Sequence, residues 1–163
     1  MLSIRGDGPI LCFGGPYSNL QATKALLEEA RRLGIPPAHT VCTGDVVAYC
    51  ADAAATVELM MASGIEVIAG NCEESLAAGS ANCGCGFEEG TFCDALSREW
   101  YAHALSEIGP AHRSWMAGLP KQIVLEIGGR RLAVLHGAAS AINRFLFASA
   151  PEAVLAAEIA ATR

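Results

Sequence analysis

The chain has 163 residues, of which 52% are hydrophobic and 17% are charged, and its net charge is −6 at pH 7. This length suits one domain with a substantial core, so we expect a single domain over residues 1–163. No apolar run approaches the roughly 20 residues of a membrane-spanning helix. The acidic balance without a large basic cluster disfavours nucleic-acid binding. We therefore expect neither a membrane nor a nucleic-acid polymer as a partner.

The N-terminal sequence MLSIRGDGPI lacks the apolar stretch of a secretory signal, which predicts a cytoplasmic location. The chain contains seven cysteines. In a reducing compartment these are more naturally thiols or metal ligands than disulfides. We expect Cys12, Cys42 and Cys50 to be small buried hydrophobic residues.

The first half of the chain alternates short apolar runs with helical patterns. A strand is predicted over residues 10–13 and a helix over 19–33, followed by a strand over 40–43. A second helix over 53–62 leads to a β-branched strand over 65–69. Strands of this kind, joined by helices, predict a parallel sheet that is covered on both faces.

The second half of the chain has a different sequence pattern. Residues 79–93 form a loop rich in Gly, Cys and Asn, and the patterns after it predict helices over 93–108 and 110–117. Two strands flank Gly128-Gly129, which predicts a β-hairpin and makes the sheet system mixed. The last segment, 151–163, reads as a helix that runs to the chain end without a stop signal. We therefore expect the chain to lack its native C-terminal part.

Three polar residues follow predicted strands: Asp45 after Gly44, Asn71 after Gly70, and His136 before Gly137. In open α/β sheets, functional groups gather beyond the carboxyl ends of strands. A carboxylate, an amide oxygen and an imidazole suit Mn, Fe, Zn or Ni better than Ca. Taken singly, Asp45 and Asn71 are equally well explained as turn residues, and His136 as a partly buried histidine.

The order and spacing of Gly44-Asp45, Gly70-Asn71 and His136-Gly137 resemble the calcineurin-like metallophosphoesterases. The resemblance implies an α/β fold, a layered αββα sandwich of two mixed β-sheets flanked by helices. It also implies that Asp45 bridges two divalent ions and that Asn71 and His136 bind one of them. The sequence Gly70-Asn71-Cys72-Glu73 is similar to a small phosphodiesterase-like branch, which assigns catalytic roles to Cys72 and Glu73.

The chain departs from the family pattern at its first motif, Asp-x-His-Gly-Asn, where it has Gly15-Pro16-Tyr17-Ser18-Asn19. Gly15 and Tyr17 replace two metal ligands, and the last family motif, Gly-His-x-His, would lie beyond Arg163. One or two ions are thus expected, on a reduced site. Tyr17 and Asn19 are candidate substrate-binding residues, as is Arg144, whose guanidinium suits a phosphate. Arg144 is equally well explained as a surface cation.

The leading hypothesis is a metal-dependent hydrolase of a small phosphomonoester or phosphodiester. One alternative is a catalytically inactive relative that serves as a binding or regulatory protein. Another is a cysteine-based metal or redox protein that uses Cys83, Cys85 and Cys93. The aromatic residues of the 93–108 helix are typical of a core or of a dimer contact, so a homo-oligomer is possible.

Overall fold

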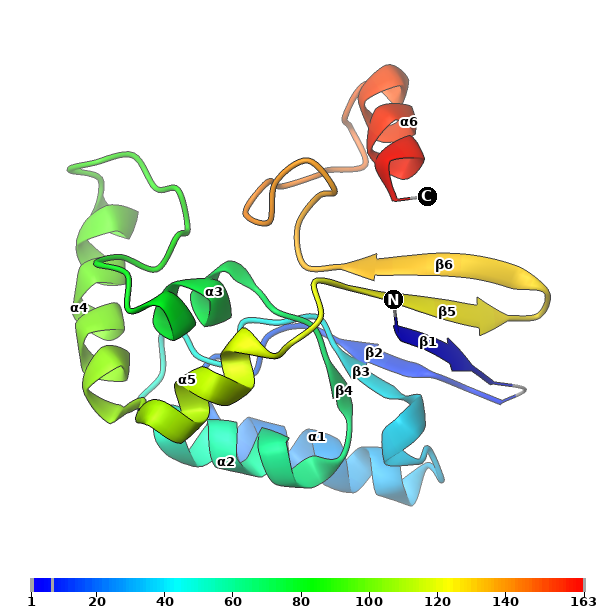
Figure 1. Cartoon of the computed structure of the whole chain (residues 1–163), viewed down its shortest axis with the longest axis horizontal. Helices are drawn as coiled ribbons and strands as arrows, with labels where there is room; N and C mark the ends of the chain where they lie inside the picture. The colour runs from blue at the N-terminus through cyan, green and yellow to red at the C-terminus, as the bar shows by residue number, and fades with distance from the viewer. Residues whose placement is uncertain (1, 7, 163) are drawn as a thin grey trace.

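The computed structural model describes residues 2–6 and 8–162, and within these residues the chain forms two three-stranded sheets with helices around them (Figure 1). One sheet has the strand order β1 (Leu2–Arg5), β5 (Gln122–Ile127), β6 (Arg130–Leu135). The other has the order β2 (Leu11–Phe13), β3 (Thr40–Cys42), β4 (Glu66–Val67).

The β2–β3–β4 sheet is parallel, as predicted, because helices connect its strands. Helix α1 (Leu20–Arg32) and the 3₁₀ turn Pro37–His39 join β2 to β3, and helix α2 (Ala53–Ser63) joins β3 to β4. Helix α2 ends at Gly64, whose φ of 70° is a left-handed conformation that glycine adopts without strain. The carboxyl ends of all three strands therefore lie along one edge.

The predicted hairpin is present, with β5 antiparallel to β6. Gly128 and Gly129 both have positive φ, as the two central residues of a tight hairpin turn require. Strand β1 pairs in parallel with β5. The sequence did not predict β1, because so short a strand is defined by its pairing with a partner strand about 120 residues away. The family resemblance implied two mixed sheets, but only this one is mixed, and the β2–β3–β4 sheet is parallel as the strand pattern predicted.

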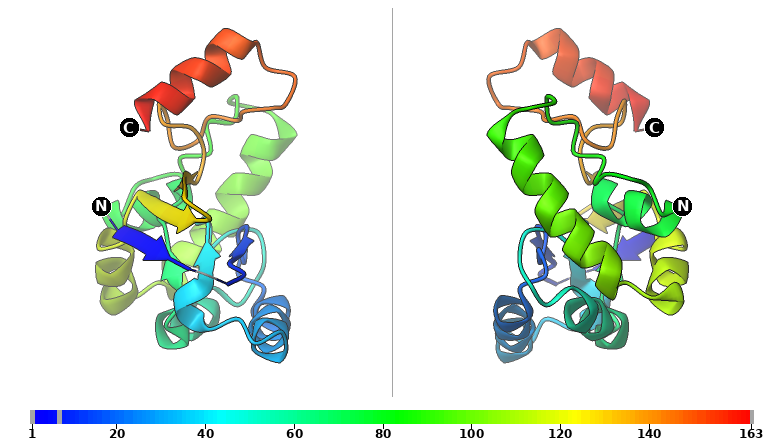
Figure 2. Two further views of the ribbon diagram at one scale, coloured as in Figure 1. Left: turned by 90° about the vertical axis from the view of Figure 1, so that its right-hand side faces the viewer. Right: turned by 90° about the vertical axis from the view of Figure 1, so that its left-hand side faces the viewer.

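The remaining helices are α3 (Asn71–Ala78), α4 (Phe92–Glu107), α5 (Pro110–Ala117) and α6 (Glu152–Ala161). Helix α3 was not predicted, because Asn71 was interpreted as a metal ligand or a turn residue after the strand over 65–69. Helices α1 and α2 lie on the opposite side of the sheets from α6 (Figures 1 and 2). The layered α/β prediction is confirmed.

Two apolar clusters hold the layers together. The smaller one lies where the two sheets meet, and its buried members are Ile4, Val41, Ile68, Ile123 and Leu125. The larger one packs the β3–β4 region against the helices and includes Met60, Leu76, Trp100 and Met116. Burial of such side chains contributes on the order of 2 kcal/mol each. No helix in the part of the chain that the structure describes is long and apolar enough to cross a bilayer.

Candidate metal centre

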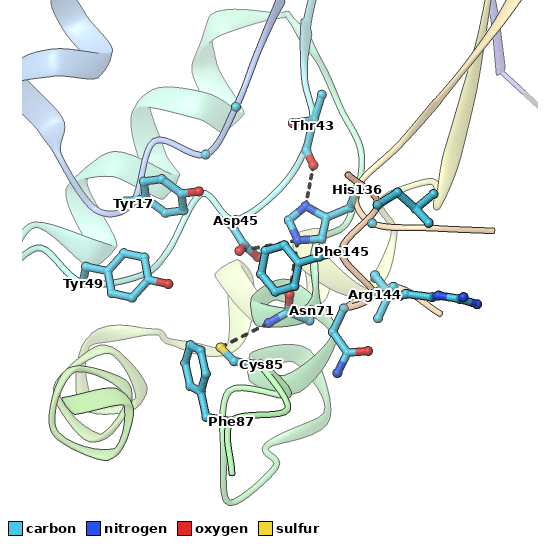
Figure 3. Close-up of a pocket in the computed structure, with 16 residues that line it drawn as sticks. Tyr17, Thr43, Asp45, Tyr49, Asn71, Cys85, Phe87, His136, Arg144 and Phe145 are labelled. Carbon is cyan, nitrogen blue, oxygen red and sulfur yellow. Dashed lines mark hydrogen bonds and ion pairs between the residues drawn. The ribbon is translucent and has the colours of Figure 1, made fainter. Parts of the chain in front are cut away.

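Asp45, Asn71 and His136 come together at the edge where the two sheets meet. Asp45 follows β3, Asn71 begins α3 just beyond β4, and His136 follows β6 of the other sheet. All three line a pocket with a volume of about 380 Å³ that is open to solvent (Figure 3). The structure thus brings together three residues that lie up to 91 positions apart in the sequence.

The donor atoms of the three side chains point toward one another (Figure 3). Nε2 of His136 lies 3.2 Å from Oδ1 of Asn71 and 3.5 Å from Oδ2 of Asp45. Nδ1 of His136 lies 2.7 Å from the carbonyl oxygen of Thr43. A carbonyl can only accept a hydrogen bond, so Nδ1 carries the proton. In the neutral ring the lone pair of Nε2 then faces Asp45 and Asn71.

The amide of Asn71 is held in one orientation. Its Nδ2 donates to the carbonyl oxygen of Cys83 at 2.9 Å and also approaches Sγ of Cys85 at 3.4 Å. The side chain is nearly buried. Because the nitrogen is used in this way, Oδ1 is directed toward His136.

Asp45 has a φ of 53°, a conformation that non-glycine residues seldom adopt. Its Oδ1 accepts a hydrogen bond from the backbone N–H of Cys72 at 3.3 Å, which leaves Oδ2 facing His136. The surrounding loops touch backbone to backbone, since a Cβ on Gly44 would lie 2.5 Å from the nitrogen of Gly70. Glycine is therefore required at this close approach.

Glu73, predicted as a catalytic residue, lies beneath the pocket and is fully buried. Its carboxylate accepts hydrogen bonds from the backbone N–H groups of Asp45 (2.8 Å), Val46 (2.9 Å) and Gly70 (2.9 Å), with a longer one from Val47 (3.4 Å). Burial and the neighbouring charge of Asp45 raise the pKa of Glu73 to about 7, although the backbone hydrogen bonds oppose this. In this position the carboxylate braces the loops of Asp45 and Gly70, and its catalytic role stays a prediction.

Cys72, the other predicted catalytic residue, is also buried beneath the site, in the large apolar cluster. Burial, followed by the charge of Asp45, raises the pKa of its thiol far above the ordinary value. Cys72 lies on the core side because consecutive side chains of a helix point about 100° apart. Asn71 faces the pocket, so Cys72 faces the core.

The predicted substrate-binding residues are placed differently from one another. Tyr17 lines the pocket, and burial raises the pKa of its phenol. Asn19 does not line it, because its Oδ1 caps helix α1 by accepting from the N–H of Ala22 at 2.9 Å. Arg144 borders the pocket, but its Nη1 bonds to Ser140 Oγ and Glu158 Oε1, each at 3.0 Å. Its guanidinium points away from Asn71 (Figure 3).

Sequence reasoning missed three residues that line the pocket: Tyr49, Phe87 and Phe145. It considered Cys85, which also lines the pocket, only as part of a cysteine-based site. Tyr49 lies four residues after Asp45, and this proximity was the one available signal. Phe87 and Phe145 belong to long loops without periodicity, so the sequence offered no comparable indication.

The cysteine-rich loop does not form a thiolate metal site. Cys83 and Cys85 form a disulfide with each other, so the prediction that the cysteines are thiols or metal ligands is wrong for this pair. Cys12 and Cys50 are exposed rather than buried. Among residues 2–6 and 8–162, no group of three or more His, Cys, Asp and Glu side chains could hold a metal ion. Any metal centre at Asp45 and His136 therefore depends on the amide oxygen of Asn71.

The donor set fits one divalent ion. Two ligands about 2.1 Å from the same ion lie roughly 3.0 to 3.4 Å apart at octahedral or tetrahedral angles. The separations from His136 Nε2 to Asn71 and to Asp45, 3.2 and 3.5 Å, are close to that range. On the side of the pocket formed by Gly15 and Tyr17, glycine offers no side-chain ligand. The residues present therefore suit one ion better than two.

By sequence, the chain matches no protein-family model and no curated protein. Its structure is similar to a metallophosphoesterase from Sphaerobacter thermophilus, with a TM-score of 0.63 and 17% identity. It is also similar to the hypothetical protein PH1004 from Pyrococcus horikoshii OT3, with a TM-score of 0.71 and 18% identity. The chain has the metallophosphoesterase fold.

The likeness extends over most of this chain but not over most of each relative. The aligned part covers 94% of this chain and 56% of the Sphaerobacter protein, and 93% of this chain and 64% of the Pyrococcus protein. At this identity the likeness establishes the metallophosphoesterase fold, whereas the site has to be argued from its own side chains.

Proposed function

We propose that this chain is a metal-dependent phosphoesterase that hydrolyses a small phosphomonoester or phosphodiester at one divalent ion. The observation that carries the proposal is the convergence of Asp45 Oδ2, Asn71 Oδ1 and His136 Nε2 at an open pocket of a metallophosphoesterase fold. Mn, Fe, Zn or Ni would act there as a Lewis acid toward a phosphate oxygen and an attacking water.

The protein's own groups prepare this site. The Thr43 carbonyl fixes the ring of His136, and the Cys83 carbonyl fixes the amide of Asn71, so neither side chain has to reorganise when a ligand enters. Asp45 contributes the negative charge. Glu73 ties the loop of Asp45 to the loop of Gly70 and so keeps the carboxylate of Asp45 beside His136.

The test compares Asp45→Asn with a matched control, Asp52→Asn. Asp52 lies at the start of α2, where its carboxylate accepts a hydrogen bond from Gln21 at 3.2 Å. Mn²⁺ affinity is measured by titration calorimetry, bound metal by mass spectrometry, and hydrolysis with p-nitrophenyl phosphate and bis-p-nitrophenyl phosphate. We expect the unchanged protein and the control to bind about one ion and hydrolyse at least one ester.

Asp45→Asn should weaken Mn²⁺ binding at least tenfold and reduce hydrolysis by a larger factor, because a charged ligand is lost. A folded protein that binds Mn²⁺ but hydrolyses neither ester would contradict the hydrolase proposal. Equal metal affinity in Asp45→Asn and Asp52→Asn would contradict the assignment of the metal ligands.

A further inference from the structure

Strained backbone is concentrated on one side of the pocket. In the described residues, the non-glycine residues with positive φ are Tyr17 (53°), Ser18 (56°), Asp45 (53°) and Tyr49 (46°). All four belong to two loops, the one after β2 and the one after β3. Such conformations persist only where the surroundings impose them, and they gather at functional sites.

Hydrogen bonds between these two loops impose the conformation. The N–H of Tyr17 donates to the carbonyl of Asp45 at 3.2 Å, and the N–H of Ser18 donates to Val46 at 2.8 Å. In return, the N–H of Cys50 donates to the carbonyl of Tyr17 at 3.1 Å. A Cβ on Gly15 would lie 2.6 Å from the Asp45 carbonyl oxygen, so this contact also requires glycine. The two loops therefore form one hydrogen-bonded unit.

This unit places two tyrosine rings against each other. The ring centroids of Tyr17 and Tyr49 are 5.2 Å apart, and Tyr49 lies 5.3 Å from Trp100, which is nearly buried. Aromatic pairs in this range are favourable. Trp100 thereby anchors the pair to helix α4.

The two phenol oxygens point into the pocket, toward Asp45 and Asn71 (Figure 3). Within the described residues, neither hydroxyl makes a hydrogen bond to protein, whereas that of Tyr101 donates to the Ser80 carbonyl at 3.0 Å. Tyr17 is 40% exposed and Tyr49 is 55% exposed, so both hydroxyls are open to a ligand that enters the pocket from solvent. The pair therefore offers two donors to a ligand.

We propose that Tyr17 and Tyr49 bind the phosphoryl oxygens of the substrate, on the side of the pocket that lacks ligands for another ion. This inference rests on the proposed function, since it places the phosphate beside the ion held by Asp45, Asn71 and His136. Two neutral phenol donors there take up charge on the phosphoryl oxygens. They are substrate-binding groups and do not ligate the metal.

The test measures binding of inorganic phosphate to the Mn²⁺-loaded protein, by titration calorimetry and by the tyrosine ultraviolet difference spectrum. The variants are Tyr17→Phe, Tyr49→Phe and the double variant, which keep the packed rings and remove only the hydroxyls. Tyr101→Phe is the control, because it removes a phenol outside the pocket. Thermal melting confirms that each variant is folded, and Mn²⁺ affinity is measured separately.

Each single variant should lose about tenfold in phosphate affinity, the effect of one hydrogen bond to a charged group, while Mn²⁺ affinity and the control stay unchanged. Unchanged phosphate affinity in the double variant would overturn the inference. So would a parallel loss of Mn²⁺ affinity, or an unchanged protein that binds Mn²⁺ but no phosphate. Phosphate binding that depends on the tyrosines in a protein without turnover would refute only the hydrolase proposal.

Discussion

At the residue scale, the proposed metal centre depends on a carboxylate that does not line the pocket. Glu73 gathers backbone N–H groups from the loop of Asp45 and from Gly70, the residue before Asn71. One buried side chain thus fixes the distance between two proposed ligands. It occupies this position because the first turn of α3 directs residue 73 inward, toward the backbone of the neighbouring loop.

We predict that Glu73→Gln lowers the free energy of unfolding by about 3 kcal/mol, because an amide NH₂ would face backbone donors and leave them without an acceptor. Mn²⁺ affinity should fall with it, as the loops separate. Urea unfolding and calorimetry measure the two quantities. Glu28→Gln, on the exposed face of α1, is the control and should change stability by less than about 0.5 kcal/mol. A fully stable Glu73→Gln protein without hydrolysis would support a direct catalytic role for Glu73.

At the scale of elements, helix α6 is joined to the segment that follows His136. Glu158 is mostly buried and accepts hydrogen bonds from the backbone N–H of Ser140 at 3.0 Å and from its hydroxyl at 2.5 Å, and it pairs with Arg144 at 3.0 Å. The Ser140 hydrogen bonds, more than the Arg144 charge, hold the pKa of Glu158 below its ordinary value. The contact turns Arg144 away from the pocket.

This lowered pKa predicts that acid loosens α6. The docked state of α6 favours the ionised carboxylate of Glu158. The contribution of Glu158 to the stability of the docked state is therefore fully present above the ordinary glutamate pKa, and it is lost as pH falls through the lower pKa of the folded protein. We expect the amides of residues 138–144 to exchange hydrogen faster at pH 3 than at pH 7, after correction for intrinsic rates. Glu158→Gln should show fast exchange already at pH 7, whereas Glu152→Gln, in the exposed first turn of α6, should not. Identical protection in all three proteins at both pH values would refute this account.

At the scale of the whole molecule, the site spans two sheets that are held together by a small apolar interface. His136 extends from the β1–β5–β6 sheet, and Asp45 and Asn71 extend from the β2–β3–β4 sheet. Ile123 of β5 is fully buried between the two sheets, beside Val41 and Ile68. The relative position of the proposed ligands therefore depends on this packing.

We predict that Ile123→Ala lowers the free energy of unfolding by about 3 kcal/mol, because truncation of a buried side chain leaves a cavity between the sheets. Leu132→Ala, on the adjacent strand, should cost less than about 1 kcal/mol, since Leu132 is 50% exposed. Urea unfolding of both variants gives the comparison. An equal loss of unfolding free energy in the two variants would show that the interface between the sheets contributes no more to stability than the exposed surface of β6.

The sequence by itself predicted the parallel strands, the helices that join them, the hairpin, and the strand-end positions of Asp45, Asn71 and His136. These features follow from local periodicity and turn chemistry, which act over a few residues. Strand β1 and helix α3 were missed, the first because a short strand is defined by a distant partner, the second because Gly70-Asn71 suits a turn and a helix start equally.

Only the tertiary structure decided which side chains near those positions face the pocket. Cys72 and Glu73 turn into the core, Arg144 turns toward Glu158, and Tyr49 lines the pocket beside Tyr17. A local pattern fixes the spacing of side chains along an element, but the rotation of that element and the meeting of separate loops depend on long-range contacts. For that reason the sequence determined where a metal could be held, and the packing of two sheets and two strained loops determined what surrounds it.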